Sequence, residues 1–106
     1  MVTFEQFKQM DIRIAKIVSV EDHPNADKLY VVTVETGDGN KKLVAGIKQY
    51  YSKDELLDKQ VVMIDNLEPA TIRGVQSNGM VLVAKDEGAL AILVPEKKVR
   101  TGSPVS

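Results

Sequence analysis

The sequence contains no cysteine and no tryptophan, and its aromatic residues are limited to three Tyr and two Phe. Without cysteine, the chain can form no disulfide, thiolate metal site or cysteine nucleophile. With so few aromatic side chains, the core must be built from Val, Ile and Leu, and β-branched residues favour strands. No apolar run approaches the length of a membrane span and no signal peptide is recognisable, so we expect a cytoplasmic protein with no membrane association.

Charge of either sign is not in excess, because 14 Lys and Arg are matched by 15 Asp and Glu, for a formal net charge of −1. Proteins that coat nucleic acid regardless of its sequence are strongly basic. The balance argues against that class, so any nucleic acid would be bound by a local patch and by shape. The length of 106 residues predicts one domain over 1–106.

The expected elements follow one another as strand, strand, strand, helix, strand, strand, with additions at both ends. The strands are expected at 12–20, 29–35, 41–45, 61–67 and 80–85, and the helix at 52–57. A further short helix is expected within 1–10, and 86–106 form a C-terminal extension that contains another apolar run at 89–94. This order predicts an all-β fold, the OB-fold, which is a small five-stranded Greek-key barrel.

Local patterns refine these elements. Thr3 with Gln6, and Ser52 with Glu55, each fit a helix capping box. The first strand should bend near Ala15, where its apolar alternation changes face. The runs 61–67 and 80–85 are apolar on both faces, so we expect both to be covered on both sides, and Leu56 and Leu57 should give the second helix a buried edge.

An OB-fold binds oligonucleotides on its second and third strands and on its first–second and fourth–fifth loops. The second of these loops, at 68–79, has Arg73 as its only charge after Glu68, followed by Gly74, Ser77, Asn78 and Gly79. A guanidinium on an exposed loop suits phosphate or base contacts, and the neutral side chains add further hydrogen-bonding groups. An ordinary solvated arginine explains the same pattern, and chemistry alone favours that explanation.

The first of these loops, at 21–28, contains His23, Asn25 and Lys28. A metal site at His23 is disfavoured because the chain has no second His and no Cys. Asn25 is typical of a turn former, and Lys28 is placed to reach a phosphate. Tyr30 either stacks on a base or packs in the interior. Of the pair Tyr50–Tyr51, we expect at least one to pack in the core.

Nothing in the sequence predicts catalysis: no Ser-His-Asp pattern, phosphate-binding glycine loop or paired-carboxylate motif stands out, so we expect neither enzyme activity nor a cofactor. The two Phe residues, Phe4 and Phe7, fall on one face of the N-terminal helix. Because a helix this short is marginal in water, they must dock on something. Two docking sites are possible: the domain's own core and a partner subunit.

Five motifs stand out along the chain: Asp11–Ile17 (DIRIAKI), His23–Tyr30 (HPNADKLY), Val44–Tyr51 (VAGIKQYY), Asn66–Pro69 (NLEP) and Ile72–Met80 (IRGVQSNGM). These motifs, in this order, closely resemble one family. It is the tRNA-binding domain at the C-terminus of many methionyl-tRNA synthetases, which also occurs free-standing, in the phenylalanyl-tRNA synthetase β chain and in multisynthetase cofactors.

The resemblance implies an OB-fold that binds tRNA by shape around its outer corner, and a homodimer joined near the N-terminal helix and the C-terminal strands. The tRNA-binding residues that we predict are Arg73, Ser77, Asn78, Met80, Asn25, Lys28 and Lys16. Met80 is expected to be partly exposed. The predicted dimer contacts are Phe4, Phe7, Leu90 and Ile92.

The chain departs from the family pattern in two places. The family often has Gly where this chain has Ala15, which makes a shallower bend. It often has a cation before the Arg-Gly pair, where this chain has Thr71 and Ile72. One cation fewer lowers affinity and salt dependence, and dimerisation would restore affinity by doubling the contacts.

The leading hypothesis is therefore non-catalytic tRNA binding, either free-standing or as a domain or β subunit of methionyl-tRNA synthetase. One alternative is a dimerisation or assembly module whose nucleic-acid surface is vestigial, which the near-neutral charge favours. Another is a general single-strand binder, which the scarcity of aromatic side chains disfavours.

Overall fold

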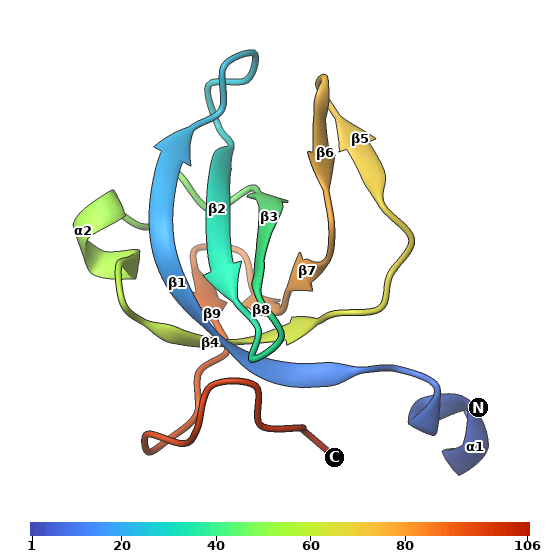
Figure 1. Ribbon diagram of the computed structural model, residues 1–106. Coiled ribbons are helices and arrows are strands. Elements are labelled where there is room, and N and C mark those ends of the chain that lie inside the picture. Colours follow the sequence, from blue (N-terminus) through green and yellow to red (C-terminus); the bar gives the residue numbers. More distant parts are fainter.

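The first strand, β1 (Ile12–Asp22), is long enough to pair with two neighbours, and the barrel is built on it. In the computed structural model, which describes residues 1–106, its first half pairs with β4 (Gln60–Ile64) and its second half with β2 (Tyr30–Glu35), both antiparallel. The sheet order β3-β2-β1-β4-β7, with β3 at Asn40–Ala45 and β7 at Met80–Val81, forms a nearly closed barrel (Figure 1). This arrangement confirms the predicted all-β OB-fold.

The bend of β1 lies further along the strand than predicted. Its register with β2 passes from Ile17 opposite Val34 to Ser19 opposite Thr33, so Val18 is an extra residue. A bulge of this kind increases the local twist and lets one strand serve both sides of a barrel. The bulge predicted near Ala15 and Lys16 is thus displaced to Val18, because Ala15 and Lys16 still pair regularly with β4.

The core is aliphatic, as the composition predicts. Its buried cluster includes Val32, Val34, Leu43, Val61 and Met63, and each of these five side chains is at most 1% exposed. The helix α2 (Lys53–Leu56), with its predicted capping box, adds Leu56 to this cluster. Leu57 was predicted to be buried but is exposed, because the chain leaves the helix at that residue.

Two tyrosines connect the core to its covering segments. The hydroxyl of Tyr30, which is buried, donates to the carbonyl oxygen of Tyr51 at 2.8 Å. The hydroxyl of Tyr51 in turn accepts the Ile92 N–H at 3.1 Å. Tyr30 therefore packs in the interior, and the prediction that one of Tyr50 and Tyr51 joins the core is confirmed by Tyr51, while Tyr50 is exposed.

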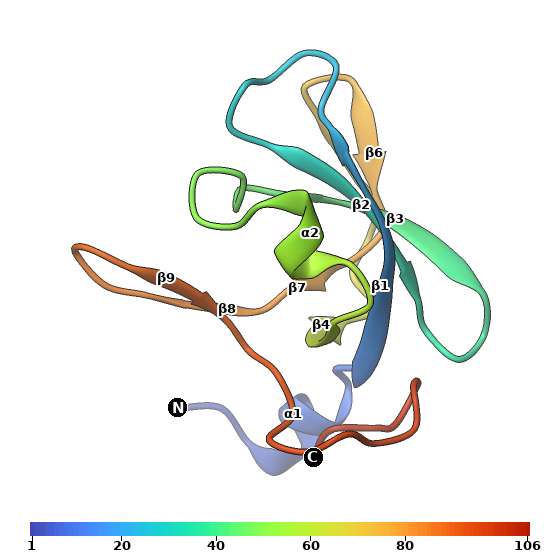
Figure 2. The same ribbon diagram turned by 90° about the vertical axis from the view of Figure 1, so that its left-hand side faces the viewer.

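The predicted fifth strand at 80–85 is divided at Leu82 into β7 and β8 (Val83–Lys85). Leu82 donates its N–H to the Val62 carbonyl, and its own carbonyl accepts the Leu93 N–H. Beyond this point β8 leaves the barrel and pairs with β9 (Leu90–Ile92) as a projecting hairpin (Figure 2). The expectation that both faces of 80–85 are covered was therefore wrong, and the side chains of β8 are exposed.

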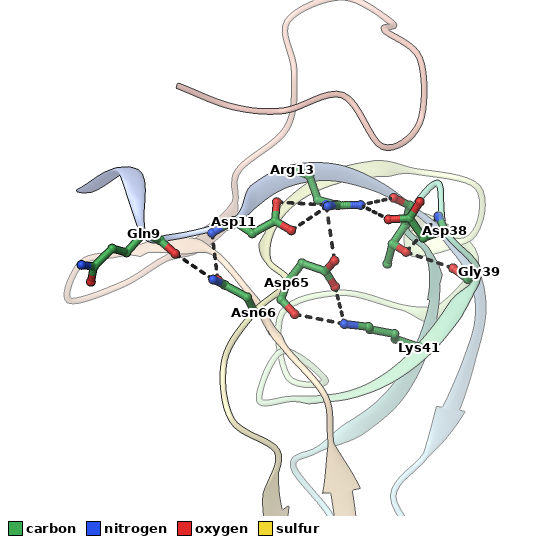
Figure 3. A network of polar contacts seen from close by, with 9 residues as sticks. Gln9, Asp11, Arg13, Asp38, Gly39, Lys41, Asp65 and Asn66 are labelled. Carbon is green, nitrogen blue, oxygen red and sulfur yellow. Dashed lines mark hydrogen bonds and ion pairs between the residues drawn. The ribbon is translucent and has the colours of Figure 1, made fainter. Parts of the chain in front are cut away.

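The short helix α1 (Phe4–Lys8) has the predicted capping box but buries none of its residues. Phe4 is 70% exposed, so the alternative in which both Phe residues pack in this chain's own core is wrong. The helix is nonetheless tethered, because the side-chain amide of Asn66 donates to the Gln9 carbonyl at 2.7 Å and its oxygen accepts the Asp11 N–H at 2.8 Å (Figure 3).

An ionic network continues from this tether into the barrel. Arg13 lies 2.6 Å from Asp11, 2.8 Å from Asp38 and 3.4 Å from Asp65, which also pairs with Lys41 at 2.6 Å (Figure 3). Hydrogen bonds to Asp11 and then Asp38 raise the pKa of Arg13 above its usual value. The network therefore joins the start of β1 to the β2–β3 turn and the end of β4.

The C-terminal extension returns to the barrel along β1. The Gly102 N–H bonds to the Ile14 carbonyl at 2.7 Å, and the Ile14 N–H bonds to the Ser103 carbonyl at 2.9 Å.

None of the helices is long and apolar enough to cross a membrane.

Candidate nucleic-acid interface

The loop between β1 and β2 and the hairpin of β5 (Ala70–Ile72) and β6 (Val75–Ser77) rise side by side at one end of the barrel. Figures 1 and 2 both show these two tips at the end opposite α1 and the C-terminus. The hairpin closes through Arg73 and Gly74, which have φ of 51° and 87°. Two positive values are typical of a type I′ turn, whose twist matches that of the flanking strands.

A set of hydrogen bonds clamps the two tips together. The Nδ1 atom of buried His23 accepts the Asn25 N–H at 3.0 Å, so the proton lies on Nε2, which donates to the Ile72 carbonyl at 2.9 Å. The Asn25 side chain donates to the Arg73 carbonyl at 3.0 Å. One nitrogen of the Arg73 guanidinium donates back to the Asn25 carbonyl at 3.2 Å. We refer to the three bonds that join the tips, together with the bond between His23 and Asn25 within the loop, as the cross-tip clamp.

The cations in and near the clamp form no ion pairs with carboxylates. Arg73, Lys28 and Lys42 are exposed and make no ion pair. The carboxylate of Asp22, at the end of β1, is bound by Lys48 at 3.1 Å and Lys53 at 3.3 Å. Hydrogen bonds from these lysines lower the pKa of Asp22 below its usual value. The two hydrogen-bonded tips therefore present Arg73 and Lys28 as unpaired cations, with one exposed carboxylate, that of Asp27, next to Lys28 in the chain.

A family model described as "Putative tRNA binding domain" matches residues 12–104. The chain belongs to this family. It is 54% identical, over 104 residues, to a methionine–tRNA ligase of Thermococcus onnurineus and to one of Pyrococcus furiosus. These matches cover 98% of this chain but 14% of each ligase, so the chain spans about one seventh of the length of these relatives.

Solved structures of the same fold cover the whole chain. A chaperone protein CsaA from Picrophilus torridus superposes with a TM-score of 0.92 at 31% identity, with 100% of both chains covered. A MetRS related protein from Pyrococcus horikoshii gives the same TM-score at 24% identity, covering 100% of this chain and 98% of that one, which is a likeness of fold. The resemblance inferred from the motifs is thus confirmed.

Within this tRNA-binding domain, the structure brings together three of the predicted site residues. Arg73 and Asn25 are bonded to each other in the cross-tip clamp, and Lys28 is exposed in the same loop as Asn25. Met80 is 48% exposed at the start of β7, as expected, while Asn78 is half-buried and donates its backbone N–H to the Lys42 carbonyl.

Two predicted residues lie elsewhere. Ser77 is 4% exposed, and its hydroxyl accepts the Val44 N–H at 2.9 Å and donates to the Gly79 carbonyl at 3.2 Å. Its hydroxyl is thus used inside the barrel, where it helps to join β6 to β3. Lys16 lies in β1, 3.7 Å from Asp58, and is not part of either tip.

Sequence reasoning missed two features of the site. His23 was considered only as a metal ligand, whereas both its ring nitrogens bind backbone groups. The β5–β6 hairpin was expected to be a loop, although Ile72-Arg-Gly-Val75, with Gly second in a two-residue turn between alternating residues, is a signal that identifies it.

Proposed function

We propose that this chain is a non-catalytic tRNA-binding module whose interface is formed by the Arg73 turn and the loop at 23–29. The observation that carries the proposal is the cross-tip clamp, in which Asn25 and Arg73 each bind the other's backbone. A cation held on a fixed backbone loses little conformational entropy on binding. The membership of the tRNA-binding domain family supports tRNA as the ligand.

Neither tip carries an exposed aromatic side chain on which an RNA base could stack. Tyr30, at the exit of the first loop, is buried, so it offers no stacking surface. Without stacking, general single-strand binding is disfavoured, and contacts to the folded backbone of tRNA are favoured. The proposed recognition is therefore directed mainly by shape.

We also propose that the module works with a methionyl-tRNA synthetase. The relatives named methionine–tRNA ligase contain this region within a much longer chain, of which it is 14%. In such an assembly, aminoacylation would belong to the remainder of the protein, and this domain would raise the affinity for tRNA. A free-standing protein of the same design is the other arrangement, which the full-length likeness to CsaA supports.

Replacing Arg73 by alanine should weaken tRNA binding about threefold to tenfold and reduce the salt slope by about 0.7 to 0.9. The expected loss follows from removing one phosphate contact together with one bond of the clamp. Titration with bulk tRNA at two salt concentrations, monitored by fluorescence anisotropy, measures both the affinity and its salt slope.

The matched control is Arg100→Ala, because Arg100 is also exposed and makes no ion pair. It lies in the C-terminal extension and should leave both affinity and slope unchanged. Equal losses for the two variants would point to bulk charge instead of a site. Binding of oligo-dT as strong as that of tRNA would overturn the tRNA proposal.

The protomer is proposed to act as a homodimer through α1, which lies below the barrel in Figure 2, and the β8–β9 hairpin, which projects from the barrel's left-hand side in that view. No residue of α1 is buried, although the Asn66 side chain holds the end of the helix by donating to the Gln9 carbonyl. Ile92 is in the core and Leu90 packs against it, so we place the contact on the exposed Leu93 and Val94, which directly follow β9.

In sedimentation at micromolar concentration, the wild type should be a dimer and Phe4→Ser should raise its dissociation constant by about tenfold or more. The reason is that Phe4 is 70% exposed in one protomer and would lose a large apolar contact. Leu57→Ser alters a residue that is 48% exposed beside α2 and should leave the dimer intact. A monomeric wild type at this concentration would exclude the dimer.

A further inference from the structure

A groove of about 550 Å³ lies between β3 and the β5–β6 hairpin. It reaches Gly74, so it adjoins the Arg73 turn and is continuous with the proposed tRNA surface. The polar side chains on its walls are those of Asn40, Lys42, Gln76 and Asn78, and apolar groups come from Leu67, Pro69 and Val75. Lys41 also lines it, but its ammonium group is bound to Asp65 at 2.6 Å.

The amide side chains in this groove differ from most others in the chain because they have no partner. The chain has four Asn and five Gln. Four of these nine side chains bond within the protein, namely Gln6, Asn25, Gln60 and Asn66. Of the five without such bonds, three lie together on the walls of the groove: Asn40, Gln76 and Asn78. This concentration is unexpected if free amides are scattered over the surface at random.

Neutral amides have a chemistry that a phosphate site does not need. Each carries a donor beside an acceptor, which matches the edge of a base, whereas a phosphate offers acceptors alone and would use only the amide's donor. Lys42, which is exposed and unpaired, would supply one cation at the rim. Because no aromatic side chain lines the groove, a base would be held by its edge and by apolar contact instead of by stacking.

We propose that this groove takes one unpaired nucleotide of the bound RNA, with its base edge on the amides and its phosphate on Lys42. The inference rests on the proposed function and extends it, because it adds base readout to a surface otherwise directed by shape. Unpaired and splayed bases are the parts of a folded RNA whose edges a protein can reach.

The test compares neutral substitutions with cationic ones. The double variant Asn40→Ala/Gln76→Ala should bind bulk tRNA at least about fivefold more weakly at both salt concentrations. Because no charge is removed, its salt slope should equal that of the wild type, whereas Arg73→Ala should reduce the slope. Gln49→Ala is the matched control, since Gln49 is an exposed amide without a partner that lies outside the groove.

Three results separate this inference from the proposed function. Weakening by Arg73→Ala, with none by the double variant, would overturn the nucleotide groove and leave tRNA binding in place. Failure of the wild type to bind tRNA would overturn both. An equal loss in Gln49→Ala would overturn the groove, because the effect would then not depend on position.

A direct measurement uses the side-chain amide signals of the ¹⁵N-labelled protein. Tetranucleotides of adenosine, cytidine or uridine should shift the signals of Asn40, Gln76 and Asn78, with one base favoured by at least about fivefold in affinity. The signal of Gln49 should stay in place, and inorganic phosphate should move none of the four. Shifts that phosphate reproduces, or that are absent with all three RNAs, would contradict base readout.

Discussion

Substitution of alanine for Gly79 is expected to lower the free energy of unfolding by about 2–6 kcal/mol, from backbone strain and overpacking together. Gly79 has a φ of 149°, and a Cβ there would lie 2.8 Å from the Met63 side chain and 2.9 Å from the Ile64 carbonyl oxygen. Met63 is fully buried, and Ile64 pairs with the first residue of β7. The added methyl group would therefore push apart the strands that close the barrel.

The measurement is urea denaturation followed by circular dichroism, with two other glycines as controls. Gly39 has a φ of 129° but nothing within 4 Å of its added Cβ, so Gly39→Ala tests the backbone strain alone. Gly88→Ala also meets open space and has no unusual φ, so it should be close to the wild type. If Gly79→Ala were no less stable than Gly39→Ala, tight closure at β7 would be refuted.

Features set by nearby residues could be predicted from the sequence. Both capping boxes formed, because each joins residues three positions apart. The barrel strands β2 and β3 also lie within one residue of the ranges 29–35 and 41–45 that were predicted for them. By contrast, the apolar pattern of 80–85 cannot say which strand will pair with it. In the structure β8 pairs with β9 instead of with the barrel, and the Leu93 N–H bonds to the Leu82 carbonyl where this hairpin leaves the barrel.

The same distinction applies to the site. The proximity of Arg73 and Asn25 could be predicted because OB-fold topology brings their loops to one end of the barrel. The roles of His23 and Ser77 could not, since each is decided by a distant partner: His23 by Ile72, 49 positions away, and Ser77 by Val44, 33 positions away. The local sequence around a polar loop residue is the same whether its side chain faces solvent or forms a hydrogen bond to a distant segment.

Loss of the His23 ring should therefore affect binding more than loss of Arg73. In His23→Ala, the Ile72 carbonyl and the Asn25 N–H both lose their partners, which should cost about 1–3 kcal/mol of stability. The tips would also be free to move apart, so tRNA affinity should fall by at least about tenfold. Chemical denaturation and tRNA titration of the same variant measure the two effects.

Two conservative variants show which bond of the ring matters. The side-chain oxygen of His23→Asn can replace Nδ1 and keep the bond to Asn25 within the loop, whereas the amide nitrogen of His23→Gln can replace Nε2 and keep the bond to Ile72 across the tips. If the clamp positions the interface, Gln should retain more tRNA affinity than Asn. Better binding by Asn would mean that the shape of the loop alone is sufficient, and the cross-tip bond would then serve stability and not recognition.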